Sequence, residues 1–271
     1  MKQKDISSDI SNTKKSRTFG IVFLLLSGAL VAYIAYPIAN IITIVEPRTF
    51  IESITRPQVG DAFLLSLSTA TISSLLLAAF GIPFAYCMAR YNFPGKFLLR
   101  VIIIIPLVIP PLASGTLLLG VFGAHTPLGL SFPVEFTQSA IGVIIAQTYV
   151  SSPFMILLSL AAFESVDESY EKVARILGKG RVETFLRISL PLAKTGIIAG
   201  FIMTWVRSVG ELGATMMMAY NPHTVSIQIF EDNAVGGFQN TLPVILLVIL
   251  LSALVLGIFS ILKKEGLKLG W

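Results

Sequence analysis

Long apolar runs without charged side chains dominate the chain. Five of them lie within residues 17–46, 61–90, 100–125, 135–164 and 232–263. Each can cross a hydrocarbon core of about 30 Å, which takes about 20 apolar residues in a helix. Helices are expected because the backbone N–H and C=O groups have no water to pair with inside a bilayer.

A sixth apolar segment carries two charged residues near its middle, Arg207 and Glu211. With it, the pattern predicts an all-α integral membrane protein of about six transmembrane helices. Residues 1–18 and 264–271 are expected to be polar tails, 19–263 the transmembrane domain and 164–191 a long cytoplasmic loop within it. The predicted spans are about 19–45, 62–89, 98–122, 137–163, 192–220 and 236–262.

Composition supports this class. Only 13% of the 271 residues are charged and 54% are hydrophobic, whereas soluble domains carry about 25% charged residues. The first apolar stretch is too long for a signal peptide, so an uncleaved first helix is expected. The single cysteine, Cys87, cannot form a disulfide within one chain.

Basic residues alternate between the predicted loops. Five lie before residue 18, three near residue 95, five near residue 180 and three from Lys263 onward, but only two near residue 53 and none near 130 and 230. Basic residues gather in cytoplasmic loops, so both termini are predicted to be cytoplasmic. The net charge of +5 then follows from topology. It suggests contact with anionic membrane lipid and gives no reason to expect a nucleic-acid partner.

Loop 164–191 has the pattern of two amphipathic helices. Ser165 and Glu168 have capping-box spacing, and Gly178 is suited to a left-handed helix end. A shorter helix follows, and Pro191 suits the first turn of the next span. Such a helix can lay its apolar face in a partner's groove, with Ala174 and Gly178 allowing close approach, or it can lie on lipid headgroups.

The third predicted span contains prolines at 106, 110 and 111. Proline removes a helix donor, and a broken helix at membrane depth must be surrounded by protein or line a cavity. Two readings remain open: a simple kink in a packed bundle, or a helix that lines a pathway.

The loop also carries a family resemblance. Glu171-Lys-Val-Ala174-Arg-Ile-Leu-Gly178, then nine residues and Ile188-Ser-Leu190-Pro191, resembles the E-A-A-x3-G-x9-I-x-L-P loop of bacterial and archaeal ABC-importer permeases. Lys172 and Val173 stand where the family usually has Glu and Ala, and Glu171 lies one residue early. The residues assigned to ATPase coupling by this resemblance are Ser165, Glu168, Tyr170, Glu171, Lys172, Ala174, Arg175, Leu177, Gly178, Ile188, Leu190 and Pro191.

The resemblance implies a set of partners. It implies a second copy of the chain, two cytoplasmic ATP-binding-cassette subunits that dock on loop 164–191, and an extracytoplasmic oxyanion-binding protein at residues 123–138 and 220–240. It also implies a prokaryotic inner or plasma membrane location. ATP and Mg would be bound by the ATPase subunits, with no cofactor on this chain.

A second resemblance narrows the family. Arg207-Ser-Val-Gly210-Glu211-Leu-Gly213-Ala214-Thr215 is similar to the R-x-x-G-E-F-G-A segment of sulfate, molybdate and tungstate permeases, with Leu212 in place of Phe. Residues 219–222 and 226–231 look more like the molybdate/tungstate branch, with a sulfate/thiosulfate permease as the alternative.

Arg207 and Glu211, four residues apart, are expected to pair on one helix face, because an isolated charge at the bilayer centre costs about 3 kcal/mol or more. They either form part of a pore or gate, with Gly210, Gly213 and Thr215, or only hold the bundle together.

Several other functions lack support in the sequence. No G-x-x-x-x-G-K-[ST] phosphate loop is present, so the chain is not expected to be the ATPase or any other enzyme, and no catalytic residues are assigned. His125 and His223 have no clustered partners, so no metal site is expected. A stand-alone secondary transporter should show paired broken helices, and a scaffold would use loop 164–191 for docking alone; both remain as alternatives.

Overall fold

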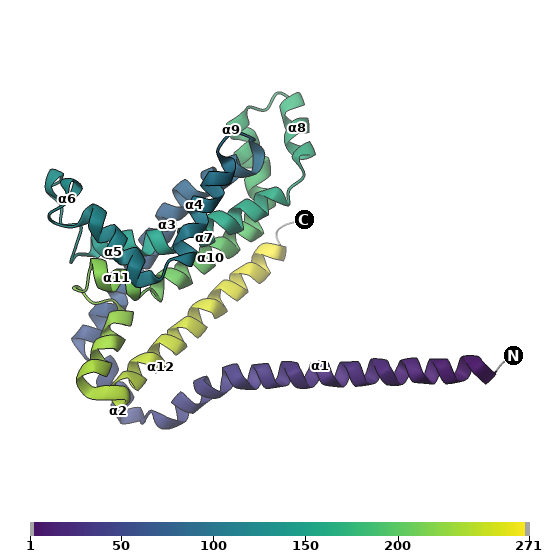
Figure 1. Cartoon of the computed structure of the whole chain (residues 1–271), viewed down its shortest axis with the longest axis horizontal. Coiled ribbons are helices and arrows are strands. Elements are labelled where there is room, and N and C mark those ends of the chain that lie inside the picture. The colour runs from purple at the N-terminus through teal and green to yellow at the C-terminus, as the bar shows by residue number, and fades with distance from the viewer. Residues whose placement is uncertain (1–2, 269–271) are drawn as a thin grey trace. The chain divides into compact units, whose positions relative to one another are not determined.

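The computed structural model describes the backbone of residues 3–268 and the side chains of 19–255 and Gly257, and the regular structure in this part is helical (Figure 1). The elements are α1 Gln3–Ile44, α2 Pro47–Ile54, α3 Pro57–Arg90, α4 Lys96–Val108, α5 Pro111–Phe122, α6 Pro127–Ser131, α7 Ala140–Glu164, α8 Glu168–Ile176, α9 Arg181–Thr184, the π-helix η1 Phe185–Ser189, α10 Leu190–Val209, α11 Gly213–Met218 and α12 Val225–Lys268.

Five helical segments in the described part are long and apolar enough to cross a membrane: Phe19–Ile44, Pro57–Arg90, Ala140–Glu164, Arg181–Val209 and Val225–Val255. The pair α4 and α5 passes the same test together, with a bend of 115° between the two helices. The all-α membrane fold with about six spans is therefore confirmed.

The predicted third span, 98–122, is two helices at a sharp angle. Ile109 has extended backbone angles between them, and Pro110 and Pro111 follow at the break. The prolines supply no N–H to continue the ladder of α4, and the residue before a proline is pushed out of the helical region. The bend is larger than the simple kink considered from the sequence.

The predicted fifth span, 192–220, is also wrong as one helix. Helix α10 ends at Val209, the chain turns through residues 210–212, and α11 begins at Gly213. The hydropathy pattern does not reveal the break at residues 210–212, because every residue around it except Arg207 and Glu211 is apolar or small. The sixth span begins earlier than predicted, at Val225, and contains a non-helical residue, Gly237, with φ +71°.

The chain divides into two compact units. One comprises residues 1–54 and 242–271, and the other residues 55–241. In the first unit a small apolar cluster joins Ile41 to Leu242 and Leu246. The side chains of α1 from Phe19 to Tyr36 are exposed.

In the second unit α3, α7 and α10 lie side by side (Figure 1). Small residues permit this approach: a Cβ atom on Gly196 would lie 2.5 Å from the Cβ of Ala162. Ser208 donates a hydrogen bond to Ser151 at 2.9 Å across the same interface. Small residues and short polar side chains are typical of helix contacts in membranes, where backbones must come close.

Candidate coupling surface and membrane-embedded ion pair

The N-cap of helix α8 lies two residues after the predicted cap. Asp167, rather than Ser165, is the N-cap, and its Oδ1 accepts a hydrogen bond from the N–H of Ser169 at 2.8 Å. This bond holds the pKa of the Asp167 carboxyl below its ordinary value. Ser165 instead ends α7, where its hydroxyl donates to the carbonyl of Ala162.

Helix α8 ends at a left-handed glycine, as the sequence predicted. Gly178 has φ +84°, a conformation that other residues rarely adopt. The N–H of Lys179 donates to the carbonyl of Ala174, and that of Gly178 to the carbonyl of Arg175. These bonds pair carbonyl groups that the end of the helix would otherwise leave free.

The inner face of α8 carries an acid. Glu171 is only 1% exposed, and its Oε1 accepts from Arg90 Nε at 2.7 Å and from Ser189 Oγ at 2.8 Å. Its Oε2 accepts from the hydroxyl of Tyr86 at 2.9 Å. We name these four residues, Glu171, Arg90, Tyr86 and Ser189, the Glu171 clamp.

The other clamp residues lower the pKa of the Glu171 carboxyl. Burial alone would raise the pKa of Glu171, but hydrogen bonds from Arg90, Ser189 and Tyr86 outweigh burial and hold this pKa below its ordinary value. The carboxyl is therefore ionised at neutral pH. Arg90 also donates from Nη2 to the carbonyl of Val166, which ties the start of the loop to the same point.

Ala174 shares this inner face. Its side chain is buried within the chain, so the expectation that it leaves room for a partner is wrong: its small size lets α8 approach the rest of this chain. On the outer side, Lys172 lies 3.7 Å from Glu168, and both are exposed. Glu168 is thus the acid of α8 that solvent and any partner can reach.

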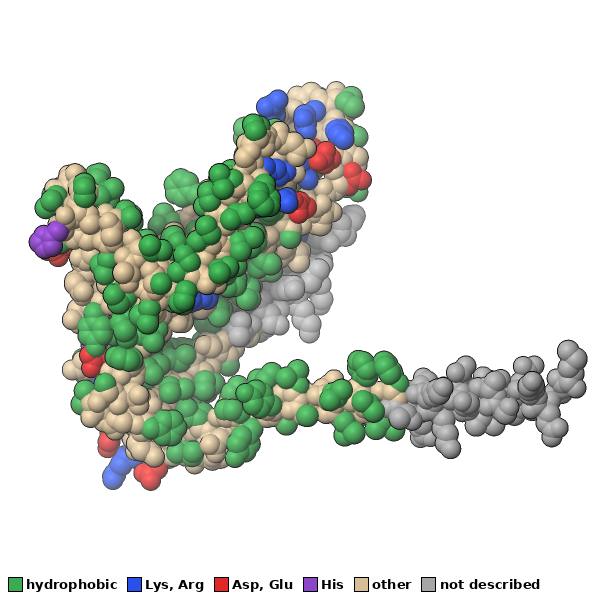
Figure 2. Space-filling model, in the orientation of Figure 1, with side chains coloured by type: hydrophobic (Ala, Val, Ile, Leu, Met, Phe, Trp, Pro, Cys, Tyr) green, Lys and Arg blue, Asp and Glu red, His purple; other side chains and the backbone are tan. Residues whose placement is uncertain are grey.

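The outer face of α8 exposes large apolar side chains beside its charged residues. Ile176 is 84% exposed, and other large apolar side chains of the loop share this exposure: Tyr170, Val173, Leu177, Val182 and Leu186. Figure 1 places α8 and α9 at one end of the bundle, and Figure 2 shows Lys, Arg, Asp and Glu side chains gathered there. The exposed side of α8 therefore carries large apolar side chains together with Glu168, Lys172 and Arg175, while Glu171 is the charged residue of α8 that is buried.

The second half of the loop is not a separate helix. Helix α9, η1 and α10 run on without an interruption, so Pro191 lies near the start of α10 but within a continuous helical segment. Ile188 and Leu190 are half-buried, and Leu190 packs on a core formed by residues such as Met88 and Phe163.

The second predicted site lies at the break between α10 and α11. Arg207 Nη1 is 2.5 Å from Glu211 Oε2, and Glu211 Oε1 accepts from the N–H of Ala214 at 2.7 Å. Glu211 is 1% exposed and Arg207 29%. The predicted pair is present, but Glu211 lies beyond the end of α10, so the two do not share one helix face. Oε2 has no well-directed hydrogen bond, which leaves the contact an ion pair.

The small residues around this pair differ in role. A Cβ atom on Gly213 would lie 2.7 Å from the Cβ of Pro111, so α11 meets the start of α5 there. A Cβ atom on Gly210 would meet only the carbonyl oxygen of Val206, at 3.6 Å, within the described part of the chain, and its part in a pore or gate stays a prediction. Thr215 donates to the carbonyls of Glu211 and Leu212 and so strengthens the turn.

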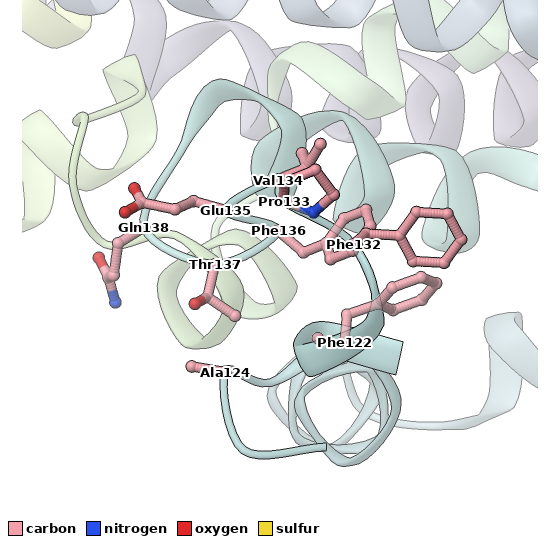
Figure 3. A pocket seen from close by; sticks show the side chains of 10 residues that line it. Phe122, Ala124, Phe132, Pro133, Val134, Glu135, Phe136, Thr137 and Gln138 are labelled. Carbon is pink, nitrogen blue, oxygen red and sulfur yellow. The ribbon is translucent and has the colours of Figure 1, made fainter. Parts of the chain in front are cut away.

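At the opposite end of the second unit, α6 and the segment after it enclose a hollow of about 560 Å³. Figure 3 shows the rings of Phe122, Phe132 and Phe136 gathered on one side of it, with Glu135 and Gln138 on the other. Gln138 Oε1 accepts from the N–H of Asn221 at 3.0 Å. This bond joins the two stretches, 123–138 and 220–240, that were expected to receive an external protein.

Sequence reasoning missed several partners. Arg90 was counted only as a cytoplasmic charge, and Tyr86 was not singled out, since each is more than 80 residues from Glu171. Arg56 and Asp232 form another unforeseen ion pair at 2.7 Å. No local pattern predicts such long-range pairs. Among the described residues, no group of three His, Cys, Asp or Glu side chains is placed to hold a metal ion.

Both the sequence and the fold have counterparts among known proteins. The family described as binding-protein-dependent transport system inner membrane component matches residues 81–264. A bacterial ABC transporter that imports the acidic polysaccharide alginate has a similar fold, with a TM-score of 0.67 at 15% identity over 92% of this chain and 97% of that one. The chain is thus a multi-pass inner-membrane subunit of an ABC transporter, and not itself an enzyme.

Curated relatives place it more narrowly. A probable molybdenum ABC transporter permease of Haloferax volcanii is 40% identical over 83% of this chain and 84% of that protein. A molybdate/tungstate transport system permease of Thermococcus kodakarensis is 37% identical over 89% and 94%. The chain belongs to the molybdate/tungstate family of ABC-importer permeases, the branch that residues 219–222 and 226–231 favoured from the sequence.

Proposed function

We propose that two copies of this chain form a translocation pathway for a tetrahedral oxyanion, molybdate or tungstate, and that α8 couples this pathway to ATP hydrolysis by a partner. The relatives named for these substrates support the choice of oxyanion. ATP and Mg are bound by two cytoplasmic ATPase subunits. This chain supplies no cofactor and no catalytic group.

The observation that carries the proposal is the set of exposed apolar side chains on the outer side of α8. Ile176 and Leu177 project from a loop helix whose inner face is fixed by Glu171. Full burial of such a side chain is worth about 1.5–3 kcal/mol, so a cleft in an ATPase subunit would gain strongly by covering this face. Insertion of the same face among lipid headgroups is the competing explanation.

Arg207 is proposed to act in the pathway. Its guanidinium is partly exposed within the membrane-spanning unit, and in the described structure its ion pair is with Glu211. A positive group attracts an oxyanion, whereas the neighbouring carboxylate weakens that attraction. Weak binding favours transport, because a tight site would hold the ion.

The outer stretches 123–138 and 220–240 are proposed to receive an extracytoplasmic binding protein that delivers the oxyanion. Their aromatic-lined hollow and the hydrogen bond between Gln138 and Asn221 would present them as one surface. This orientation requires both chain termini to be cytoplasmic, as the distribution of basic residues predicts. Closure of the ATPase pair would then turn the pathway outward, and hydrolysis would return it inward.

Reconstitution tests the proposal. The permease, its ATPase and its binding protein are placed in liposomes, and ATP hydrolysis is measured with molybdate, tungstate and sulfate in turn. Stimulation by molybdate and tungstate, accompanied by their uptake, is expected. Stimulation by sulfate alone would assign the chain to sulfate transport. Uptake driven by an ion gradient without the ATPase would indicate a secondary transporter and overturn the proposal.

A further inference from the structure

We propose that the Glu171 clamp is a positioning device, required for movement of α8 to reach the membrane helices but not for α8 to bind the ATPase. This inference rests on the proposed coupling role of α8. It adds the path by which movement of α8 reaches the membrane helices. This role requires no contact between the clamp residues and substrate or nucleotide. They act through the helices they join.

One carboxylate links three elements. Glu171 lies in the middle of α8, Tyr86 and Arg90 occupy successive turns at the end of α3, and Ser189 closes η1. All three donors meet the two oxygens of Glu171 at 2.7–2.9 Å. A displacement of α8 must therefore carry α3 and η1 with it or break charge-assisted hydrogen bonds away from water.

The nature of these contacts distinguishes them from ordinary packing. Apolar surfaces can slide past one another with little change in contact, whereas hydrogen bonds to a carboxylate are directional. Because Glu171 is buried and ionised, an arrangement that separates it from Arg90 would leave it only the more distant countercharge of Arg175, which lies 3.6 Å away on α8 itself. The clamp thus admits one orientation of α8 relative to α3, the orientation in which Ile176 faces outward.

The π-helical segment η1 connects the Glu171 clamp to α10. A π-helix is rare and is often found at functional positions, where an extra residue widens the turn. Residues 185–189 form this turn, directly before α10. Ser189 holds it to Glu171, and α10 then runs to Val209, just past Arg207. Movement of the clamped joint would be transmitted along α10 to the break that carries the Arg207–Glu211 pair.

The clamp departs from what the loop sequence suggests. Glu171 was among the residues assigned to ATPase coupling, yet its carboxyl is turned into the permease, while Glu168 remains exposed on α8. A purely adhesive surface needs only its exposed side chains, whereas three hydrogen bonds to a buried, ionised acid also resist displacement of α8 relative to α3 and η1. The arrangement fits a helix that must transmit force in a fixed direction.

The test uses the complete reconstituted importer with Glu171→Gln, which keeps the side-chain shape but removes the charge. Three quantities are measured: binding of the ATPase subunit to the permease, ATP hydrolysis, and oxyanion taken up per ATP hydrolysed. We expect ATPase binding close to that of the wild type and uptake per ATP at least about fivefold lower, the lower range of coupling between sites. Arg100→Gln is the matched control, because it breaks an exposed 2.8 Å ion pair with Glu164 at the same end of the bundle.

Two milder variants keep the test decisive if Glu171→Gln does not fold. Tyr86→Phe and Ser189→Ala each remove one hydrogen bond and leave the Arg90–Glu171 pair in place, and both should lower uptake per ATP by a smaller factor. Unchanged uptake per ATP in the folded clamp variants, or a loss that follows ATPase binding alone, would overturn the clamp. If ATP hydrolysis in the wild-type importer did not depend on the permease, the coupling role of α8 itself would be overturned.

Discussion

Gly115 of α5 lies directly against Ala214 of α11: a Cβ atom on Gly115 would come within 2.8 Å of the Ala214 carbonyl oxygen and 2.7 Å of the Cβ of Met217. Since backbone atoms cannot move aside as a flexible side chain can, Gly115→Ala must separate the two helices. We expect a loss of about 1–3 kcal/mol in folding stability, as in other overpacked cores, measured as a lower Tm of the purified permease.

Gly120 provides the control on the same helix, because no atom lies within 4 Å of a Cβ placed there. Gly120→Ala should leave the Tm unchanged or slightly raised, since alanine favours helix over glycine. Equal Tm values for both variants would mean that α5 and α11 do not meet as closely as the structure places them.

Acid should weaken the Glu171 clamp in a way that can be separated from general acid denaturation. The pKa of Glu171 in the folded protein lies below its ordinary value of 4.5. The ionised carboxyl therefore stabilises the folded state above that value, and its contribution is lost as the pH falls through the folded-state pKa. The Tm of the wild type should fall more steeply than that of Glu171→Gln between about pH 5 and pH 3. Parallel curves would show that the carboxyl does not stabilise the fold by its charge.

The Arg207–Glu211 pair predicts a strongly non-additive double mutant. Arg207→Met leaves the buried carboxylate of Glu211 with its hydrogen bond from Ala214 but no countercharge, at a cost of roughly 3 kcal/mol or more. Glu211→Gln leaves the cation unpaired instead. The combined variant removes both charges, so its unfolding free energy should lie well above the additive expectation. Additive losses in a double-mutant cycle would mean that the two side chains do not interact.

Transport separates the two roles that the sequence left open for this pair. If Arg207 only holds the bundle, the charge-free double variant should regain oxyanion uptake along with stability. If Arg207 lines the pathway, stability should return while uptake stays at least about tenfold below the wild type, the effect of losing about 1.4 kcal/mol of favourable interaction. Uptake and Tm measured on the same preparations decide between them.

The membrane spans could be predicted from the sequence because charge-free length is a strong physical requirement inside a bilayer. Helix breaks were harder. Pro110 and Pro111 marked one, but Gly210 and Gly213 marked the other only weakly, since both residues are also common inside membrane helices. Hydropathy averages over such a break and therefore joined α10 to α11 in one predicted span.

The loop helix shows a second limit of sequence reasoning. Periodicity identified an amphipathic segment, and Gly178 was expected at its end, but periodicity could not tell which face turns inward. Tyr170, Val173, Ala174 and Leu177 lie at helical intervals, yet the structure exposes Tyr170, Val173 and Leu177 and buries Ala174 together with Glu171. The orientation depends on Arg90 and Tyr86, whose distance along the chain hides the contact. Ile176 was not among the residues assigned to coupling, although it is the most exposed apolar side chain of α8.

Ile176 is the residue on which the docking of α8 can be tested most directly. Its side chain makes little contact with its own chain, being 84% exposed, so Ile176→Asp should leave the Tm of the permease almost unchanged. If the ATPase covers this face, burying an unpaired carboxylate should weaken ATPase binding at least about thirtyfold, as expected of a central interface residue worth 2 kcal/mol or more. Binding is measured with purified permease in nanodiscs and the isolated ATPase. Leu130→Asp, a similarly exposed leucine on α6 at the opposite end of the bundle, introduces the same charge and should leave that affinity unaltered. If ATPase binding survives Ile176→Asp while association of the permease loop with anionic vesicles is lost, α8 rests on lipid headgroups and the ATPase must be held by another surface.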